Sequence, residues 1–497
     1  MKENPIRLQY SGFIIFAAKM FSVATGVAFQ YMIARYTTTG EYGIWFNIND
    51  VLAYFTITAG IMPFWVLRFV ARSEKGAVKT GVVANFAISL AATFVYLPLI
   101  PLIVSALGAQ QYISLYLLAS FQIVELHMLG VFEACLRAKK PQTLGYGLVI
   151  AEVSKVLFGY ILIVGLQKPL EGAVIGLTAG IAAQLLYYLK LLAEDLKQKI
   201  EWAYVREWLK GSIANVYNLL GNQIAAFIFI LLFTYGGKAA RGFYGAASLI
   251  ANIISYSTVL AFALYPKLLA ERKSEDITTS LKTVLMFAIP MTAGALAAPD
   301  LYLSILEREY ARAWYVLGVL AVDALVATIS TVFGFVLYGF ERVDEKARIS
   351  FKELFKSRMF LSFSLPYIHS AVTIPLTYFV LSTYTQNQPE LSAFSVAIIN
   401  SAMRFAMFMI LYLMVRGMVK VVIPWRNIAK YVFASVIMGC LLCWLRLQLQ
   451  LARVYQILGV SAFAGILYLA LLMVIDKDTR MLAESAWLEI KTKFEYG

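Results

Sequence analysis

Long apolar runs alternate with short charged connections along the whole chain. Each run is long enough for a helix to cross roughly 30 Å of hydrocarbon. The runs lie near residues 10–34, 42–67, 80–105, 111–136, 144–166, 170–192, 208–235, 240–265, 280–299, 312–339, 359–382, 391–415, 427–446 and 452–475. This pattern predicts an all-α polytopic membrane protein with about 14 transmembrane helices.

The distribution of Lys and Arg between the connections supports this count. If the N-terminus lies inside, the inside segments hold 32 of the 43 basic residues and the outside connections hold 8, while Lys19, Lys155 and Arg404 fall within spans. Cytoplasmic loops of membrane proteins are enriched in Lys and Arg. We therefore expect a multi-pass protein of the cytoplasmic cell membrane with both termini in the cytoplasm. The first run contains Lys19 and is longer than a signal-peptide core, so we expect it to remain as the first span.

Composition narrows the function classes. The chain is 61% hydrophobic and 14% charged, whereas about 25% of the residues of a soluble domain are charged. The net charge of +14 does not indicate nucleic-acid binding, because no soluble segment is long enough to form a binding domain. With two His and three Cys, we expect no metal site, cofactor or disulfide framework. No nucleophile–base pair, phosphate-binding glycine loop or ATPase domain stands out, so we expect a transporter and not an enzyme.

The chain contains an internal repeat. Residues 210–275 echo residues 10–74, with Tyr54 matched by Tyr256 and Pro63 matched by Pro266. Six helices return the chain to the same side of the membrane, so the repeat is parallel. We expect two pseudo-symmetric six-helix lobes followed by two C-terminal helices. The expected domains are residues 1–200 (N-lobe, helices 1–6), 201–420 (C-lobe, helices 7–12), 421–476 (helices 13–14) and 477–497 (a cytoplasmic amphipathic tail).

Polar residues share helical faces inside several predicted spans. Polar groups inside hydrocarbon are costly and often mark substrate or ion paths. The candidates for lining a substrate cavity are Lys19, Gln30, Asn47, Asp50, Tyr54, Asn215, Asn218, Asn222 and Arg404. In this interpretation Lys19 and Arg404 hold an anionic head group, because Arg donates two parallel hydrogen bonds to phosphate and Lys acts as a point charge. The alternative is that Lys19 pairs with Asp50 as a packing contact and that the Asn residues bond between helices.

Three carboxylates within the predicted spans are candidates for coupling transport to an ion or proton gradient, namely Asp323, Glu125 and Glu152. Lys155 lies three residues after Glu152, so these two residues can neutralise each other. The sixth span also carries a stripe of small residues, Gly172, Gly176 and Gly180. Such a stripe lets a neighbouring helix approach closely, and we expect that helix to belong to the same chain.

The N-terminal helical pair resembles a known family. Ala34 and Arg35 end the first apolar run, Gly40 to Gly43 are expected to break and restart the chain, and a basic exit with Arg68 and Arg72 follows the second run. This "aR", "-eyG-" and "-R-vA-" pattern resembles the polysaccharide-transport branch of the multidrug/oligosaccharidyl-lipid/polysaccharide exporter superfamily. The predicted helix count extends the resemblance across the whole chain.

This resemblance implies a flippase for lipid-linked oligosaccharide or polysaccharide precursors. Its substrate would be a polyprenyl-phosphate-linked glycan, moved by alternating access of two lobes from the cytoplasmic to the outer leaflet, among membrane lipids. The resemblance leaves the partner glycosyltransferases or polymerase unnamed. A multidrug or organic-cation antiporter of the same superfamily is the first alternative, since Asp50 and Asp323 could make an acidic cavity. A membrane glycan polymerase is the second, but the outside connections are short.

Overall fold

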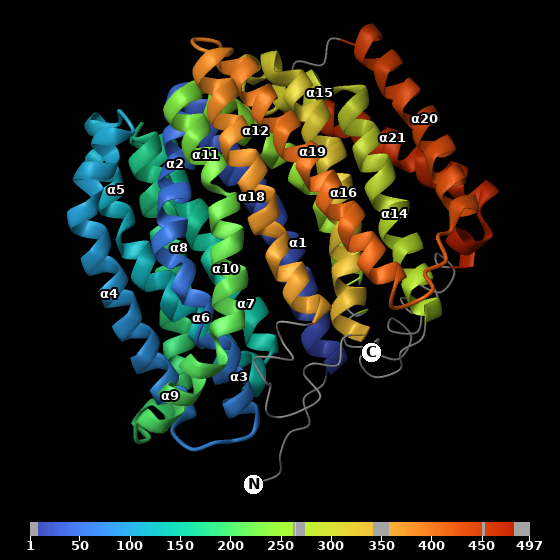
Figure 1. Ribbon diagram of the computed structural model, residues 1–497. Helices are drawn as coiled ribbons and strands as arrows, with labels where there is room; N and C mark the ends of the chain where they lie inside the picture. The colour runs from blue at the N-terminus through green and yellow to red at the C-terminus, as the bar shows by residue number, and fades with distance from the viewer. Residues whose placement is uncertain (1–7, 262–263, 265–273, 341–356, 450–452, 482–497) are drawn as a thin grey trace. The chain divides into compact units, whose positions relative to one another are not determined.

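The computed structural model describes residues 8–261, 264, 274–340, 357–449 and 453–481. Every regular element in these ranges is a helix (Figure 1). The expected all-α polytopic fold is therefore confirmed for the part of the chain that the structure describes. Residues 482–497 of the expected tail, 477–497, lie outside these ranges, as does most of the connection between the tenth and eleventh spans.

Within the described residues, thirteen helical segments are long and apolar enough to cross a membrane. They correspond one by one to the second to fourteenth predicted spans. The segments are Thr39–Ala71, Ala77–Ala106, Gln110–Lys139, Gln142–Gly165, Pro169–Leu192, Asn215–Gly236, Lys238–Ala261, Ser274–Ala297, Arg308–Phe340, Arg358–Thr383, Pro389–Arg416, Trp425–Gln448 and Val454–Ile475. The first predicted span is present as α1, Leu8–Tyr36, a helix of 29 residues.

The chain divides into two compact units. The first comprises Met1–Gly242 and Pro366–Pro389. Its helices are α1, α2 (Thr39–Thr56), α3 (Pro63–Ala71), α4 (Ala77–Ala106), α5 (Ile113–Ala119), α6 (Phe121–Lys139), α7 (Gln142–Gly159), α8 (Pro169–Leu192), α9 (Trp202–Gly211), α10 (Ile213–Ala225) and α11 (Phe227–Leu231), with the start of α12 (Lys238–Ser255) and the second part of α18 (Arg358–Thr383).

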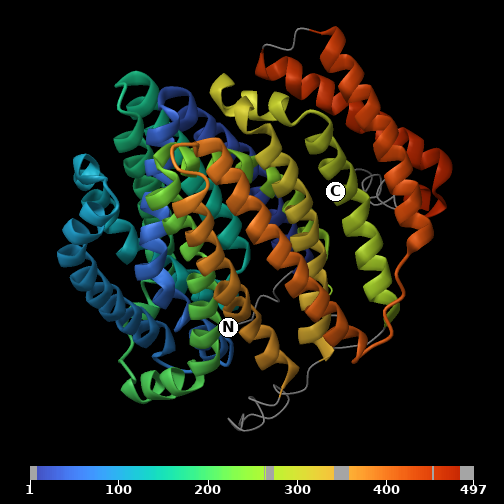
Figure 2. The same ribbon diagram turned by 45° about the horizontal axis from the view of Figure 1, so that its top comes forward.

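The second unit comprises Phe243–Leu365 and Glu390–Gly497. It holds the rest of α12, the first part of α18, and α14 (Ser274–Ala297), α15 (Pro299–Ser304), α16 (Trp314–Phe340), α19 (Pro389–Arg416), α20 (Trp425–Gln448) and α21 (Val454–Ile475). Within this unit α14 packs against α20, and α20 against α21. Both ribbon views show these three helices as neighbours (Figures 1 and 2). Buried side chains from α14, α16 and α19 to α21 form its hydrophobic core.

The glycine stripe of the sixth span lies on α8 and faces α7. A Cβ added at Gly176 would lie 3.2 Å from the backbone nitrogen of Gly159, and one at Gly180 would lie 2.8 Å from the carbonyl oxygen of Ala151. These contacts leave no room for a side chain, because interiors are packed as densely as organic crystals. The predicted packing partner within the same chain is therefore confirmed.

The second span is broken near its middle. Thr38 caps the start of α2: its hydroxyl accepts from the Glu41 amide at 3.2 Å, and the Glu41 carboxylate accepts from the Thr38 amide at 2.9 Å. The chain then tightens into a 3₁₀ turn, η1 (Ile57–Gly60), before α3 begins at Pro63. Proline suits this first helical position because it lacks an N–H to donate. Gly40 and Gly43 lie inside α2 and not in the turn expected from the sequence, because the capping box starts the helix earlier.

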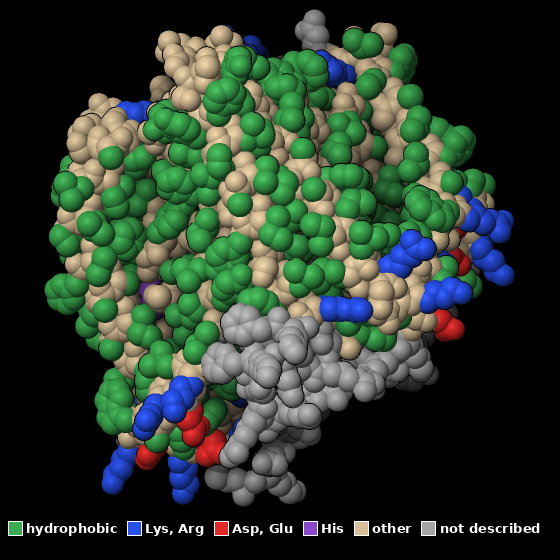
Figure 3. Space-filling view, viewed as in Figure 1, with side chains coloured by type: hydrophobic (Ala, Val, Ile, Leu, Met, Phe, Trp, Pro, Cys, Tyr) green, Lys and Arg blue, Asp and Glu red, His purple; other side chains and the backbone are tan. Residues whose placement is uncertain are grey.

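The connection between the sixth and seventh spans carries a short amphipathic helix, α9. Trp208 is fully buried and packs edge-on against Phe69, with ring centroids 5.4 Å apart. On the other side, Trp202 is 62% exposed and Leu209 is 51% exposed. Charged side chains gather over this helix in the space-filling view (Figure 3). Exposed apolar and basic residues on one short helix are typical of a membrane interface.

Candidate functional site

In the first unit, α2 and the first turn of α12 cross at two glycines. A Cβ at Gly43 would lie 3.2 Å from the Gly242 nitrogen, and a Cβ at Gly242 would lie 3.3 Å from the Gly43 nitrogen. Only glycine fits at both positions, so the two backbones come together here. Asp50 follows Gly43 by seven residues and therefore lies on the same face of α2. The crossing thus places the Asp50 side chain close to the residue that precedes Gly242 in the sequence.

That residue is Arg241, and it binds Asp50 through two hydrogen bonds. Arg241 Nε donates to Asp50 Oδ2 at 2.6 Å, and Arg241 Nη2 donates to Oδ1 at 2.9 Å. The Arg241 side chain is 7% exposed and that of Asp50 is 15% exposed. The guanidinium also lies over the rings of Phe46 and Phe229, at 4.7 and 4.9 Å from their centroids. The sequence alternative that pairs Lys19 with Asp50 is wrong, because Arg241 occupies both carboxylate oxygens.

Arg241 is the site residue that sequence reasoning missed. It lies inside the eighth predicted span, 240–265, yet the loop-charge count places it in an outside connection. The signal that could have identified it is the cost of a carboxylate inside a span, which requires a nearby cation. For Asp50 this cation is Arg241, which lies 191 positions further along the chain.

Three polar side chains around this pair are buried and lack hydrogen bonds at one atom. They are Asn47 at Nδ2, Tyr54 at its hydroxyl and Gln223 at Nε2. Asn47 is fully buried, and its Oδ1 accepts from the hydroxyl of Tyr116 at 2.5 Å. Buried polar atoms are normally satisfied by protein or ordered water. The candidate face of α2 is therefore divided, with Asn47 tied to α5 and Asp50 tied to α12.

Lys19 differs from these buried groups. Its side chain is exposed on α1, and it forms no ion pair within the described residues. Further along α1, Gln30 Oε1 accepts a hydrogen bond from the Tyr42 hydroxyl at 3.0 Å. Lys19 is close enough to Glu133 on α6 to interact with it electrostatically, whereas Gln30 joins α1 to α2.

Glu152 on α7 is fully engaged by its neighbours. Lys155 Nζ lies 2.6 Å from Glu152 Oε2, which confirms that these two residues neutralise each other. On α1, the hydroxyls of Ser22 and Thr25 donate to the Glu152 carboxylate at 3.0 and 2.5 Å. The cluster ties α1 to α7 at a depth where unpaired charge is costly.

The amides on α10 follow two patterns. Asn215 Nδ2 donates to the carbonyl of Gly60 at 3.2 Å, in the broken part of the second span. Asn222 Nδ2 donates to the Asn218 side-chain oxygen at 3.2 Å and to its carbonyl at 2.9 Å. Asn215 thus bonds between helices, while Asn218 and the exposed Asn222 form a ladder along one helix.

Aromatic rings border this amide ladder. Tyr217 stacks on Tyr367 of α18, with ring centroids 4.5 Å apart and planes 21° apart. The Tyr367 hydroxyl also donates to the Tyr217 carbonyl at 2.7 Å. Stacked rings beside amide groups are the kind of surface that can contact both the faces and the hydroxyls of a sugar.

Glu125 and His127 lie on α6 in different environments. His127 is fully buried, with Nδ1 2.7 Å from the Ile123 carbonyl and Nε2 2.8 Å from the Thr58 hydroxyl. Since the carbonyl can only accept, Nδ1 carries the proton and Nε2 accepts from Thr58. Glu125 Oε2 is buried without a hydrogen-bond partner. Of the two, Glu125 is the group free to take up a proton or a cation.

In the second unit, Asp323 and Arg404 form an ion pair. Arg404 Nε on α19 lies 3.2 Å from Asp323 Oδ1 on α16. Asp323 is 8% exposed at its side chain, whereas Arg404 is 39% exposed. The sequence treats these two residues as separate candidates, for ion coupling and for binding a head group. The structure brings them together in one contact. No group of three or more His, Cys, Asp or Glu in the described ranges could hold a metal ion.

Comparisons with known proteins bear on the fold. No protein-family model matches the chain, and no curated protein is similar to it in sequence. Among solved structures, the chain is similar to the lipid II flippase MurJ in its inward closed conformation, with 16% identity, a TM-score of 0.68 and coverage of 94% of this chain and 99% of that chain. It is also similar to an inward-facing multidrug resistance MATE family transporter of the MOP superfamily, with 13% identity, a TM-score of 0.60 and coverage of 80% and 95%.

These likenesses concern the fold, because the sequence identities are low. They agree with the exporter superfamily to which the N-terminal motif is similar. The chain is therefore a multi-pass membrane protein with a fold like that of the lipid II flippase MurJ and of the MATE family transporter.

Proposed function

We propose that this protein is a flippase that moves a lipid-linked oligosaccharide or polysaccharide precursor from the cytoplasmic to the outer leaflet. The substrate class is an anionic head group of phosphate and sugar on a polyprenyl chain. The protein forms no covalent intermediate with it, and the cycle is alternating access of the two repeat lobes.

The observation that carries this proposal is the pairing of the charged candidates. Both acidic residues that could attract an organic cation are bound to arginine, Asp50 to Arg241 and Asp323 to Arg404. Lys19 forms no ion pair within the described residues and is exposed, with Glu133 as an electrostatic neighbour. Among the charged candidates for lining the cavity, the side chain left exposed and without an ion pair in the described residues is therefore the cationic Lys19, and this supports an anionic substrate over a cationic drug.

The fold comparison gives secondary support. The flippase structure matches 94% of this chain, whereas the MATE structure matches 80%. The larger share of the chain matched by the flippase fold is consistent with the proposal.

Within this proposal the residues have distinct roles. Lys19 holds the phosphate as a point charge. Asn218 and Asn222 bind sugar hydroxyls, and Tyr217 contacts a sugar face. Asp50 is held by Arg241 and supports the packing of α2, just as Asp323 holds Arg404 in the second unit. Glu125, which has an unpartnered carboxylate oxygen, is the proposed group for coupling to an ion or proton gradient.

The test is the flipping of a fluorescent lipid-linked oligosaccharide in proteoliposomes. We expect wild type to flip the lipid and Lys19→Gln to lose most of the activity, because the phosphate loses its countercharge. Lys19→Arg keeps the charge and is the matched control, so it should retain flipping. Lys19 is exposed and forms no ion pair within the described residues, so both variants should fold as wild type does.

The competing function is drug export. The same proteoliposomes, loaded with a small organic cation and given a proton or sodium gradient, provide its assay. Gradient-driven efflux of that cation, together with no movement of any lipid-linked glycan, would reject the flippase. Equal flipping by Lys19→Gln and wild type would reject the role of Lys19.

A further inference from the structure

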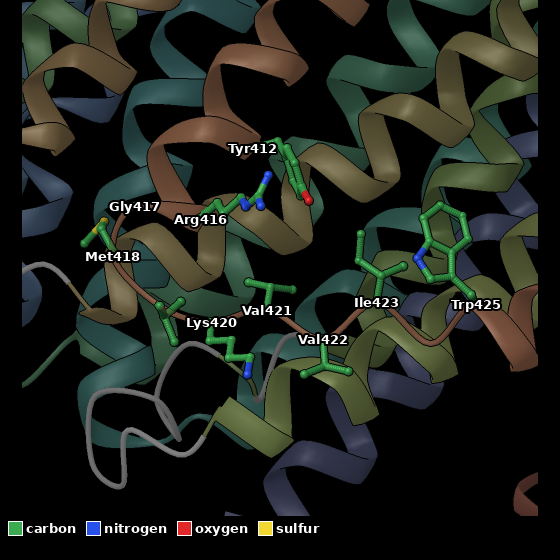
Figure 4. A pocket seen from close by; sticks show the side chains of 10 residues that line it. Tyr412, Arg416, Gly417, Met418, Lys420, Val421, Val422, Ile423 and Trp425 are labelled. Atoms are coloured by element: carbon green, nitrogen blue, oxygen red, sulfur yellow. The ribbon is translucent and has the colours of Figure 1, made fainter.

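The connection between α19 and α20 borders a cavity of about 670 Å³ in the second unit. The lining residues come from the end of α19, the connection and the start of α20 (Figure 4): Tyr412, Arg416, Gly417, Met418, Val419, Lys420, Val421, Val422, Ile423 and Trp425. None of them is acidic, and none belongs to the site described above.

The cavity carries two cations. Arg416 and Lys420 are exposed, and neither forms an ion pair within the described residues. A second cavity in the same unit, of about 610 Å³, differs in this respect, since its Arg446 is 2.6 Å from Asp300. A positively charged cavity without a built-in carboxylate is suited to an anionic ligand from outside the chain.

The backbone of the connection adds further donors. From Lys420 to Ile423, no N–H donates to a backbone carbonyl of the described residues. The segment is held in place from the side, because the Thr278 hydroxyl donates to the Val422 carbonyl at 3.0 Å. Free backbone amides beside an Arg side chain are common ligands of phosphate oxygens.

The side chains of the connection lie on two opposite sides of its backbone. Figure 4 shows Arg416 and Tyr412 on the same side as Val421 and Ile423, while Lys420 and Val422 point the other way. Such alternation is expected for extended backbone. The Tyr412 hydroxyl makes no hydrogen bond within the described ranges, so it can donate beside the Arg416 fork. Arg416 is therefore placed as the principal phosphate ligand, and Lys420 as an additional charge at the other rim.

Apolar surface continues directly from these donors. Trp425 is 70% exposed and Val422 is 57% exposed. Both lie where two membrane spans, Pro389–Arg416 and Trp425–Gln448, meet their connection. Tryptophan is enriched at the boundary between hydrocarbon and water. A ligand that fills this cavity must join an anionic group to an apolar body at the depth of a lipid head group.

We propose that this cavity binds the head-group phosphate of an anionic membrane phospholipid. Arg416, Tyr412 and the amides of the connection hold the phosphate, and the glycerol and first acyl carbons lie over Val422 and Trp425. The loop-charge pattern predicts this connection on the cytoplasmic side, where the membrane surface is negative. The cavity shares no residue with the proposed flippase substrate site, and this proposal does not depend on that site.

The test is equilibrium binding of fluorescent phosphatidylglycerol to the full-length protein in detergent, with phosphatidylcholine as the zwitterionic comparison. A cation near the membrane surface contributes roughly a fivefold gain in affinity. We expect Lys420→Gln to weaken phosphatidylglycerol binding by about fivefold and Arg416→Gln by about tenfold or more, since Arg also loses its directed hydrogen bonds. Tyr412→Phe should weaken binding less and leave the packing intact.

Arg426→Gln is the matched control. Arg426 is exposed in the first turn of α20 but does not line the cavity. Binding by this variant should equal that of wild type; an equal loss for Arg426→Gln and Arg416→Gln would reject a defined site in favour of diffuse attraction.

Two competitors separate the sources of phosphate. Inorganic phosphate and glycerol phosphate should not displace the lipid at millimolar concentration, because they lack the apolar body. Displacement by either at that concentration would overturn the proposal and indicate a free-phosphate site. Tighter binding of a lipid-linked oligosaccharide than of phosphatidylglycerol, lost in Arg416→Gln, would equally overturn it and make the cavity a substrate site.

Discussion

Asp50 and Arg241 lie 191 residues apart in the chain and share two hydrogen bonds of 2.6 and 2.9 Å. Their helices can approach this closely because Gly43 and Gly242 meet one another at the crossing. The bidentate geometry, with aromatic rings over the guanidinium, satisfies a charge that would otherwise be costly inside a span. The contact between the two glycines and the ion pair between the two charged residues thus stabilise the same helix crossing.

Removing either charge of this unit should destabilise the protein. We expect Arg241→Gln or Asp50→Asn to cost about 3–5 kcal/mol, because each leaves an uncompensated buried charge. The double variant should recover part of the loss, since neither charge remains. Thermal unfolding in detergent, arranged as a double-mutant cycle, measures this coupling. Lys19→Gln is the control and should unfold as wild type; additive losses in the cycle would contradict the pairing.

The Arg404–Asp323 pair should respond more weakly. Arg404 is 39% exposed at its side chain, compared with 7% for Arg241. Water can therefore partly replace Arg404 when it is removed. We expect Arg404→Gln to destabilise the protein less than Arg241→Gln, and Arg404→Lys to be milder still. The same unfolding assay checks the order, and a larger loss for Arg404→Gln would show that this pair is the more deeply desolvated one.

Glycine positions offer a matched test of packing. At Gly180 an added Cβ would lie 2.8 Å from the Ala151 carbonyl oxygen, whereas at Gly465 it would meet nothing within 4 Å. We expect Gly180→Ala to cost about 1–3 kcal/mol through overpacking. Gly465→Ala should be neutral or stabilising by about 0.5–1 kcal/mol, because alanine favours the helix. Unfolding temperatures of the two variants, which add the same methyl group, decide whether α7 and α8 pack as described.

Acid should weaken the second unit through Asp476, which follows α21. Burial opposes ionisation of Asp476, but hydrogen bonds from Lys430 at 2.8 Å and from Thr479 outweigh it and lower the pKa of the carboxyl group. A lowered pKa stabilises the fold above the unfolded value of about 3.9, and this contribution is lost as the pH falls towards the folded value.

The pH dependence can be measured by comparing wild type with Asp476→Asn. We expect wild type to lose stability below about pH 4 and the variant to lose less over the same range, since it has no such carboxylate. Asp478→Asn is the comparison, because the Asp478 side chain is 42% exposed and should matter less. Parallel curves for wild type and Asp476→Asn would assign the acid sensitivity to other groups.

The sequence was sufficient to predict the helices because the constraint that makes them is local. Hydrocarbon demands about 20 apolar residues in succession with every backbone group bonded internally. Runs such as 80–105 and 170–192 therefore correspond closely to Ala77–Ala106 and Pro169–Leu192. The Glu152–Lys155 pair could be predicted for the same reason, since both residues lie on one turn of one helix.

The partners of Asp50 and Asp323 could not be predicted in this way. Periodicity shows which face of a helix carries a charge but not which helix lies opposite that face. Arg241, the partner of Asp50, lies at the start of a predicted span, where a basic residue resembles one that belongs to a loop. The break after Thr56 had a readable signal in Gly60 and Pro63 within one apolar run. The capping box at the start of α2 also had a signal in the sequence, namely the spacing between Thr38 and Glu41.

The break in the second span also has a mechanical consequence. A helix that changes to a 3₁₀ turn at Ile57–Gly60 and restarts at Pro63 lacks the continuous series of backbone hydrogen bonds that keeps an α-helix straight. The carbonyls of Gly60 and Ile61 are bonded instead by the side chains of Asn215 and Ser212 on the neighbouring chain segment. Side-chain bonds of this kind can lengthen or exchange without unwinding the backbone. We therefore expect the second span to bend more easily at this break than a continuous helix would, with the bend held by the chain segment around α10.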